Sequence, residues 1–244
     1  MSALKIAAAI EEEFAEADFP EHDEALQKIL DEAGPVDFAL TVYGDDPAYI
    51  KAIETLEKAE ELLAECAPDS KEEKDARKFL EEAQKEAIKF NPSEAEKRVV
   101  VVEQILEIAS RFEFSLARRA YDYFVFNGRH WKQIDPELLR AWLGQVAAKM
   151  GIKSYRAKQV KFRALQIEQF EETANNPATA RSDGPTLVNL LNGTLEISDQ
   201  GAKLREHRME DFQTYVLPFA YDPEATAPPF QKYLDRVLPD ADLQ

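Results

Sequence analysis

Residues 187–238 read LVNLLNGTLEISDQGAKLREHRMEDFQTYVLPFAYDPEATAPPFQKYLDRVL and decide the fold of the carboxyl-terminal part of the chain. The apolar residues over 187–191 lead into Asn192-Gly193, a dipeptide suited to a type I′ turn. Polar and apolar residues then alternate over residues 194–197, as they do in a half-buried strand. We therefore expect a β-hairpin over residues 187–197.

A second β-rich run, residues 215–221, follows a polar stretch. Pro218 lies inside this run, and proline donates no backbone hydrogen bond, so the strand must lie at a sheet edge or form a bulge. The chain then passes through Asp222-Pro223 and Pro228-Pro229, which interrupt regular structure. A last short helix is expected over residues 230–237.

The same stretch resembles the domain that precedes the motor in poxvirus-type and phage or plasmid primase-helicases. Its pattern combines an N-L-x-N-G-T-L turn, a His and an Asp after a polar run, and an L-P strand followed by Y-D-P. The positions that match it are Asn189, Leu190, Asn192, Gly193, Thr194, Leu195, His207, Asp211, Leu217, Pro218, Tyr221, Asp222, Pro223, Ala225, Pro229 and Phe230. Upstream, FVFNGRHWK at residues 124–132 resembles the hairpin that opens this domain. The resemblance covers residues 117–244.

In that family the domain lies directly before a superfamily 3 helicase motor. The resemblance implies a DNA-replication protein of phage or plasmid type, in which ATP and Mg²⁺ are cofactors of the motor alone. A motor of this kind cradles its triphosphate in a G-x-x-x-x-G-K-[ST] loop, and this motif is absent from the sequence. We expect a piece of a larger ATP-dependent helicase or primase that has no enzyme activity and no cofactor of its own.

The implied partners are single-stranded or forked DNA and the helicase motor domain. The module would position DNA, or help to assemble and couple the motor, which forms a hexameric ring in such helicases. An oligomer is therefore expected. This function, with its DNA and motor partners, follows from the resemblance.

Charge is distributed unevenly along the 244 residues. Residues 1–116 hold 13 lysines and arginines against 30 carboxylates, a net charge of −17, whereas residues 117–244 hold 17 of each and are neutral. A dense carboxylate surface suits a protein partner with a basic groove. The alternative interpretation is therefore an acidic protein-interaction module, or an inhibitor that mimics DNA, without nucleic-acid binding.

A single cysteine, Cys66, excludes an internal disulfide and fits a reducing compartment. No apolar run reaches the roughly 18 residues that a membrane helix needs. Acidic residues follow MSALKIAAAI, where a signal peptide would continue apolar. We expect a cytoplasmic protein with no membrane partner.

The first half of the chain contains clear helix start signals. Capping side chains precede helical runs at Asp46-Pro47, Ser70, Asn91-Pro92 and Asp135-Pro136. The expected helices cover about residues 3–17, 21–33, 47–66, 71–90, 92–113 and 136–150. The four valines at 99–102 also fit a strand, but the cap before them favours a helix. Residues 36–43 are a weaker strand candidate or a packed loop.

After Leu116 the sequence becomes typical of strands. Aromatic residues over 121–126, the Asn127-Gly128 turn and residues 131–134 predict a second hairpin. A basic helix is expected over residues 154–173. The fold class is therefore α+β and mostly α: an N-terminal helical bundle, in an acidic helical module of residues 1–116, followed by a smaller α+β domain with β-hairpins, residues 117–244.

Residues 118–163 hold 11 basic residues and only three acids. Lys153 with Arg156, and Lys158 with Lys161, are three residues apart and would line a stripe on one helix. The candidate nucleic-acid-binding residues are Arg118, Arg119, Arg129, Trp131, Lys132, Lys153, Arg156, Lys158, Lys161 and Arg163. Trp131 would stack on a base while the cations follow the phosphates. The competing interpretation places Trp131, Trp142 and Tyr155 in the core and leaves the cations as a solvated face.

The helical half also offers carboxylates for a magnesium site on adjacent helices, at Glu57, Glu60, Glu61, Glu81, Glu82 and Glu86. A solvated acidic face paired with lysines explains them better. No nucleophilic side chain lies at a sequence spacing that would suggest catalysis with His22, His130 or His207. We therefore predict no catalytic residues and no metal site.

Overall fold

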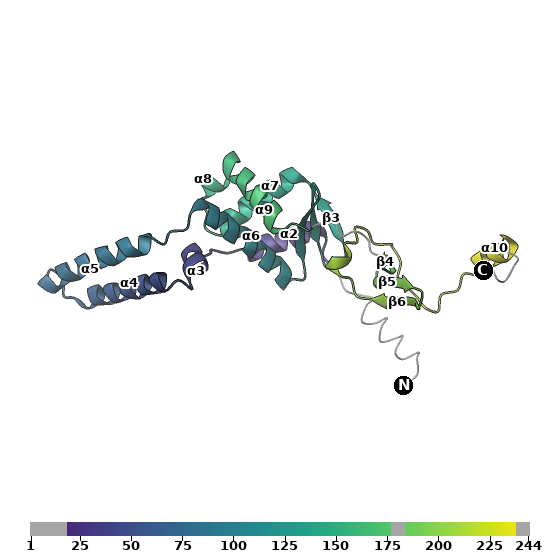
Figure 1. Ribbon diagram of the computed structural model, residues 1–244, viewed down its shortest axis with the longest axis horizontal. Helices are drawn as coiled ribbons and strands as arrows, with labels where there is room; N and C mark the ends of the chain where they lie inside the picture. Colours follow the sequence, from purple (N-terminus) through teal and green to yellow (C-terminus); the bar gives the residue numbers. More distant parts are fainter. Residues whose placement is uncertain (1–18, 177–183, 238–244) are drawn as a thin grey trace, which may run out of the picture. The chain divides into compact units, whose positions relative to one another are not determined.

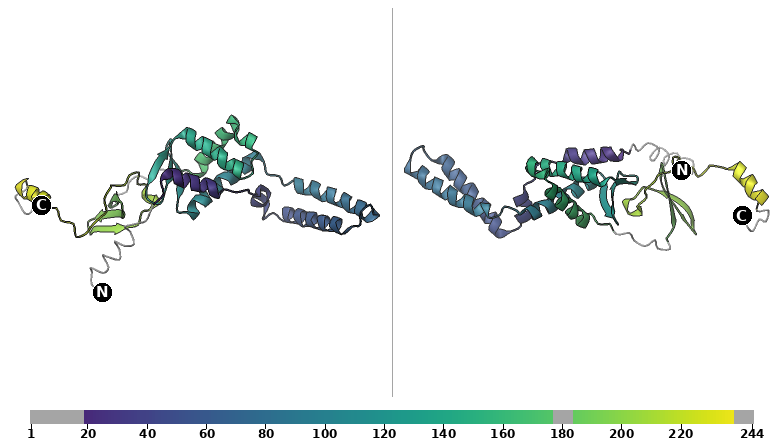
Figure 2. Two further views of the ribbon diagram at one scale, coloured as in Figure 1. Left: turned by 180° about the vertical axis from the view of Figure 1, so that it is seen from behind. Right: turned by 90° about the horizontal axis from the view of Figure 1, so that it is seen from above.

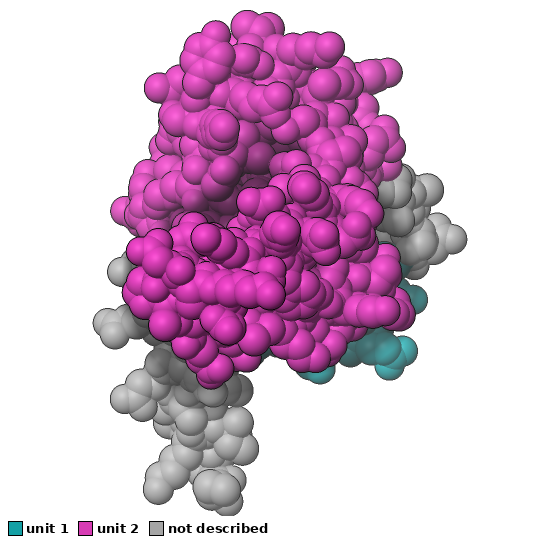
Figure 3. Space-filling view, turned by 90° about the vertical axis from the view of Figure 1, so that its left-hand side faces the viewer, with its two compact units in different colours: residues 1–18, 181–244 teal, residues 19–180 magenta. Residues whose placement is uncertain are grey.

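The computed structural model describes residues 19–176 and 184–237, which belong to two compact units. Unit 2 is Phe19–Ala180, and the described residues of unit 1 are 184–237 (Figures 1 and 3). Helices predominate and two small antiparallel sheets accompany them, which confirms the predicted α+β, mostly α class. None of the described helices is long and apolar enough to cross a membrane. The helix predicted over residues 3–17 lies outside the described residues.

Unit 2 contains eight helices and one sheet among its described residues. Its helices are α2 (His22–Glu32), α3 (Phe38–Tyr43), α4 (Pro47–Glu65), α5 (Lys71–Ile88), α6 (Glu94–Arg111), α7 (Pro136–Lys149), α8 (Ser154–Ala157) and α9 (Val160–Thr173). Its sheet has the order β1 (Ser115–Arg119), β2 (Asp122–Phe126) and β3 (Trp131–Ile134).

The predicted capping residues begin most of these helices. Asp46 and Asp135 accept hydrogen bonds from first-turn amides ahead of a proline, and Ser70 accepts one from the amide of Glu73. Helix α6 differs from the prediction, because Ser93 and Glu96 form a reciprocal capping box and the helix begins at Glu94. The valines at 99–102 lie in this helix, as predicted.

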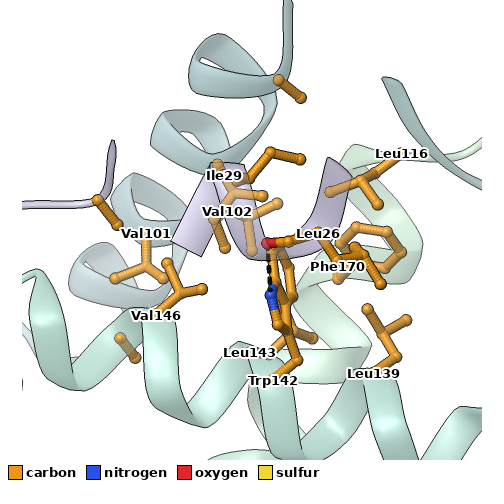
Figure 4. Close-up of a cluster of buried hydrophobic side chains, with 14 of the residues drawn as sticks. Leu26, Ile29, Val101, Val102, Leu116, Leu139, Trp142, Leu143, Val146 and Phe170 are labelled. Carbon is orange, nitrogen blue, oxygen red and sulfur yellow. Dashed lines mark hydrogen bonds between the residues drawn. The ribbon is translucent and has the colours of Figure 1, made fainter. Parts of the chain in front are cut away.

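One hydrophobic core joins elements from both halves of the sequence. Leu26 of α2, Val101 and Val102 of α6, Leu116 of β1 and Phe170 of α9 are all buried in it (Figure 4). The indole of Trp142 on α7 donates a hydrogen bond of 3.1 Å to the carbonyl of Leu26. The predicted domain boundary at residue 116 therefore does not coincide with the division of the structure, because α2 and α6 share their core with the first sheet, α7 and α9.

Helices α4 and α5 form an antiparallel hairpin that extends from the other helices of unit 2 (Figures 1 and 2). Its interface buries small residues, Ala52 and Ala59 on α4 and Ala76 and Ala83 on α5. No residue of α4 or α5 belongs to the core cluster. These helices were expected in a bundle, whereas the core of unit 2 uses α2, α6, α7 and α9.

Two short elements differ from the predictions for the first half. Residues 36–43, predicted as a strand or a packed loop, contain helix α3, because the Asp37 carboxylate accepts hydrogen bonds from the amides of Ala39 and Leu40 at 3.0 Å each. This local cap outweighs the strand preference of Thr41 and Val42. Strand β1 was not predicted. It pairs with β2 from Ser115↔Phe126 to Arg119↔Asp122.

Unit 1 contains the second sheet, with the order β4 (Thr186–Leu190), β5 (Gly193–Ser198) and β6 (Gly201–Arg205), followed by the short 3₁₀ helix η1 (Met209–Asp211) and by α10 (Pro228–Val237). The predicted hairpin and last helix are confirmed. The turn lies one residue earlier than predicted, since Leu190 pairs with Gly193 and leaves Leu191-Asn192 between the strands. The side chain of Asn192 is instead bound to the backbone of Tyr221 at 2.8 and 3.0 Å.

The strand predicted over residues 215–221 is wrong. This segment follows the outer edge of β4 through only two backbone bonds, from Leu217 N–H to the carbonyl of Asn189 (2.9 Å) and from Leu191 N–H to that of Phe219 (3.1 Å). Pro218 lies between them without a donor, so no regular ladder forms. Strand β6 lies in the stretch that the sequence pattern predicts as a polar run, and it was not predicted as a strand.

Polar contacts hold unit 1 together. Asn189 is fully buried, accepts hydrogen bonds from Thr194 (3.1 Å) and His207 (2.8 Å) at its carbonyl oxygen, and donates to the carbonyl of Tyr215 (2.9 Å). Arg205 forms two bonds to Asp211 at 2.7 and 2.8 Å and one to Glu196 at 2.9 Å. Leu190 is the one large hydrophobic residue that is buried among residues 184–237.

Candidate nucleic-acid interface

The basic helix predicted over residues 154–173 is broken in two. Helix α8 ends at Ala157, Lys158 and Gln159 leave the helix, and α9 starts at Val160. The guanidinium of Arg163 donates to the carbonyl of Ala157 at 3.1 Å and fixes this bend. Gly144 of α7 makes the close approach feasible, because a Cβ there would lie 2.9 Å from both the Ala157 carbonyl oxygen and Arg163 Nε.

Four exposed residues lie on either side of this bend, and we call them the α8 corner: Lys153, Tyr155, Lys158 and Lys161. Tyr155 is 80% exposed, and the three lysines are exposed as well. Among residues 19–176 and 184–237, no carboxylate forms an ion pair with any of these lysines. The α8 corner therefore presents three cations beside one accessible aromatic ring.

The other two predicted cations of this region have structural partners. Arg156 on α8 forms an ion pair with Glu94 at the start of α6. Arg163 is half-buried and bound to the Ala157 carbonyl, as described above. The predicted stripe on one helix is therefore wrong, because Lys153 and Arg156 belong to α8 and Lys161 belongs to α9, while Arg163 is engaged in the bend itself.

Arg118 and Arg119 lie on β1, at the other end of α9. The amide of Arg118 donates to the carbonyl of Ala174 and its carbonyl accepts from Asn176, both at 2.8 Å, just after α9 ends. Helix α9 has 14 residues and is about 21 Å long at 1.5 Å per residue. The ten predicted residues thus do not form one surface, since the two groups lie at opposite ends of this helix.

Trp131 does not stack on an external base. Its side chain is 1% exposed, and its ring packs on that of Phe126 with centroids 5.3 Å apart. Arg129 lies over the ring of Phe19 at 4.5 Å, whereas Lys132 on β3 is exposed. The prediction of Trp131 as a stacking residue is therefore wrong, and its burial agrees with the competing core interpretation.

The loop between β2 and β3 is anchored to the start of α2. Nδ2 of Asn127 donates to the carbonyl of Pro20 at 2.7 Å, and Nε2 of His22 lies 3.1 Å from the carbonyl of His130. The two histidine rings meet edge to face with centroids 4.5 Å apart. Burial lowers the pKa of His22, and burial together with the neighbouring His22 lowers the pKa of His130 to about 4. Both rings are neutral at pH 7.

The chain matches a family of protein domains described as D5 N terminal like, over residues 105–239. This match covers more than half of the 244 residues. The chain belongs to this family. A comparison with curated proteins found no match.

The D5 N terminal like family is the N-terminal region of primase-helicase proteins, so the chain carries a replication-associated domain. This confirms the predicted resemblance at the level of the family. The matched residues begin inside α6 and end after α10, and they include the α8 corner and β1. Helices α2 to α5 precede the match.

The glutamates considered for a magnesium site, Glu57, Glu60, Glu61, Glu81, Glu82 and Glu86, are all exposed on α4 and α5. In the described part of the chain, no group of three or more His, Cys, Asp or Glu side chains is arranged to hold a metal ion.

Two exposed tyrosines differ from the predictions. The competing interpretation places Tyr155 in the core and the strand pattern includes Tyr121, yet they are 80% and 90% exposed. Tyr155 lies between Lys153 and Arg156, and this aromatic residue among cations was the available signal.

Proposed function

We propose that this chain is a non-catalytic replication module that binds single-stranded or forked DNA at the α8 corner and presents it to a superfamily 3 helicase motor. Membership of a primase-helicase family supports a role in replication. The observation that carries the DNA contact is the 80% exposed Tyr155 between lysines that have no ion pair within the described residues. ATP, Mg²⁺ and any hexameric ring would belong to the motor.

The lysines and the tyrosine of the α8 corner are exposed and remain accessible to a ligand. Exposed lysines attract phosphates and release counterions from the DNA when they bind. An exposed tyrosine ring stacks on an unpaired base of any sequence. Arg163 and Gly144 hold the backbone bend between α8 and α9, so that a ligand need not order this backbone when it binds.

The direct test is fluorescence anisotropy with a labelled single strand and a labelled fork at about 50 mM salt. Lys158→Glu with Lys161→Glu should lower the affinity at least tenfold, and Tyr155→Ala should lower it about fivefold or more, the loss of one stacked base. The matched control is Lys51→Glu with Lys58→Glu, which makes the same charge change on exposed positions of α4. Equal losses in both double variants would contradict a specific α8 corner.

A second measurement tests the absence of catalysis. The purified chain incubated with ATP, Mg²⁺ and DNA should produce no phosphate above background, and turnover would remove this proposal. If the chain binds no DNA at low salt, the acidic protein-interaction module is the better account.

A further inference from the structure

Helix α10 carries its apolar residues on one side and exposes them. Phe230, Tyr233, Leu234 and Val237 follow the three- and four-residue spacing of a single helix face, and we call them the α10 stripe. Three of them, Phe230, Tyr233 and Val237, are 60%, 57% and 52% exposed, and the two rings stack with centroids 6.4 Å apart. A lone helix of ten residues is only marginally stable in water, so α10 needs a surface that buries this stripe.

The second sheet has an apolar face that suits such a helix. Residues paired across antiparallel strands point to the same face, and two cross-strand rows of one face contain no charged residue. These rows are Thr186, Ile197 and Ala202, and Val188, Leu195 and Leu204. Ile197 is 41% exposed, and among the described helices none packs extensively against this sheet. A three-stranded sheet gains stability when a helix covers its apolar face.

The opposite face of this sheet is polar and has its own cover. Asn189 and Arg205 point to that face, where Asn189 binds His207 at 2.8 Å and Arg205 binds Asp211 at 2.7 and 2.8 Å. The segment that follows β6 therefore packs on the polar face. The apolar face is the one that α10 fits.

The connection to α10 favours the sheet of another copy over its own. The backbone of Tyr221 is bound to Asn192 at one end of the sheet, and residues 222–227 lead from there to α10. Pro223, Pro228 and Pro229 stiffen this connection, because proline fixes its own φ and holds the preceding residue extended. A stiff, extended connection directs a helix away from the sheet that precedes it.

We propose that two copies of this chain exchange α10, so that the α10 stripe of each copy packs on the apolar face of the other copy's second sheet. Exchange of an identical element is a low-cost route to a closed dimer, and it uses both unpaired apolar surfaces of each copy. With about 100 Å² buried for each exposed residue of the stripe and a similar area on the sheet, the two contacts bury on the order of 1,200 Å², enough for a specific dimer. This pairing goes beyond the proposed DNA contact and does not depend on it.

The first test is the molar mass by light scattering without DNA, at about 100 μM chain, above the micromolar dissociation constant of a weak interface of this size. The wild type should have twice the mass of one chain, as should Lys158→Glu with Lys161→Glu. Phe230→Ser with Tyr233→Ser should weaken the dimer at least tenfold, because two aromatic anchors are lost. A wild-type monomer, or a dimer that the two α10 changes leave intact, would overturn the exchange.

Cross-linking identifies which sheet α10 covers. In a Cys66→Ser background, a chain with Ile197→Cys is mixed with a chain with Val237→Cys and treated with a short bis-maleimide. The exchange predicts a linked peptide that joins positions 197 and 237 of two chains. Lys203→Cys in place of Ile197→Cys is the matched control, since Lys203 is exposed on the opposite face, and it should give no such peptide. If one chain with both Ile197→Cys and Val237→Cys is linked within itself, α10 covers its own sheet and the exchange is wrong. The absence of any link between these positions would overturn it as well.

Discussion

His22 and His130 form a neutral pair that joins the start of α2 to the β2–β3 loop. Burial lowers the pKa of both, that of His130 to about 4, and Lys132 and Arg129 act in the same direction, whereas Glu21 and Asp23 oppose the effect at His22. A histidine whose folded pKa lies below its unfolded value of about 6.5 binds fewer protons when folded. Its stability contribution is fully present above pH 6.5 and is lost as the pH falls towards 4.

Unit 2 should therefore unfold at a lower urea concentration at pH 5 than at pH 7. Replacement of both His22 and His130 with glutamine should lower stability at pH 7 and flatten the dependence between pH 5 and 6.5, a window above the titration of ordinary carboxylates. Urea midpoints followed by the tryptophan emission of unit 2, which comes from the buried Trp131 and Trp142, measure this pH dependence. If the urea midpoint of the double variant depends on pH as steeply as that of the wild type, the two histidines do not cause the pH dependence of stability.

Arg205 stabilises unit 1 through its ion pairs, and its replacement should lower the stability of this unit. Its side chain and that of Asp211 are 13% and 11% exposed, and the ion pair to Asp211 with the neighbouring Glu196 raises the pKa of the guanidinium. Arg205→Ala leaves Asp211 buried without its cation, which costs about 3 kcal/mol. Unit 1 buries little apolar surface, so this loss should unfold the second sheet.

Hydrogen exchange tests this loss locally. In Arg205→Ala the amides of β4 and β5 should lose protection while those of α7 keep theirs. Arg208→Ala, at an exposed neighbouring arginine, should leave all of these amides protected. Retained protection of β5 in Arg205→Ala would mean that the polar network is dispensable.

We expect that the α4–α5 hairpin can be shortened without unfolding the core of unit 2. Its helices pack on each other, and near its base the ring of Tyr49 meets that of Phe90 at 5.5 Å. Replacement of residues 55–84 with a short glycine-containing turn should leave the melting temperature of unit 2 within a few degrees of the wild type. DNA affinity should not fall, because this segment holds more acids than bases. A large drop in melting temperature would show that the hairpin supports the core.

The sequence predicted elements well where a local signal specifies them. The caps at Asp46, Ser70 and Asp135 place α4, α5 and α7 without reference to the rest of the chain. The break between α8 and α9 has no glycine or proline, since it depends on Arg163 reaching the Ala157 carbonyl past Gly144. Burial of Trp131 and exposure of Tyr155 likewise depend on tertiary packing, which is why the sequence pattern predicted Trp131 rather than Tyr155 as the exposed aromatic residue.

The boundary between the acidic and the neutral half of the sequence does not coincide with the boundary between the two structural units. The net charge of −17 belongs to residues 1–116, yet α2 and α6 of that half build the core that supports the α8 corner and β1. The family match begins inside α6. The matched residues share their core with the part of this helix that precedes the match.

The salt dependence of DNA binding shows whether the lysines of the α8 corner contact phosphates. Three lysines that neutralise three phosphates of a single strand contribute about −2 to the slope of a plot of log affinity against log salt concentration. The slope should become shallower by about 2 when Lys153, Lys158 and Lys161 are all replaced with glutamine, and it should be unchanged when Lys51, Lys58 and Lys74 are replaced in the same way. A wild-type slope near zero, or equal slopes in the two triple variants, would contradict the account.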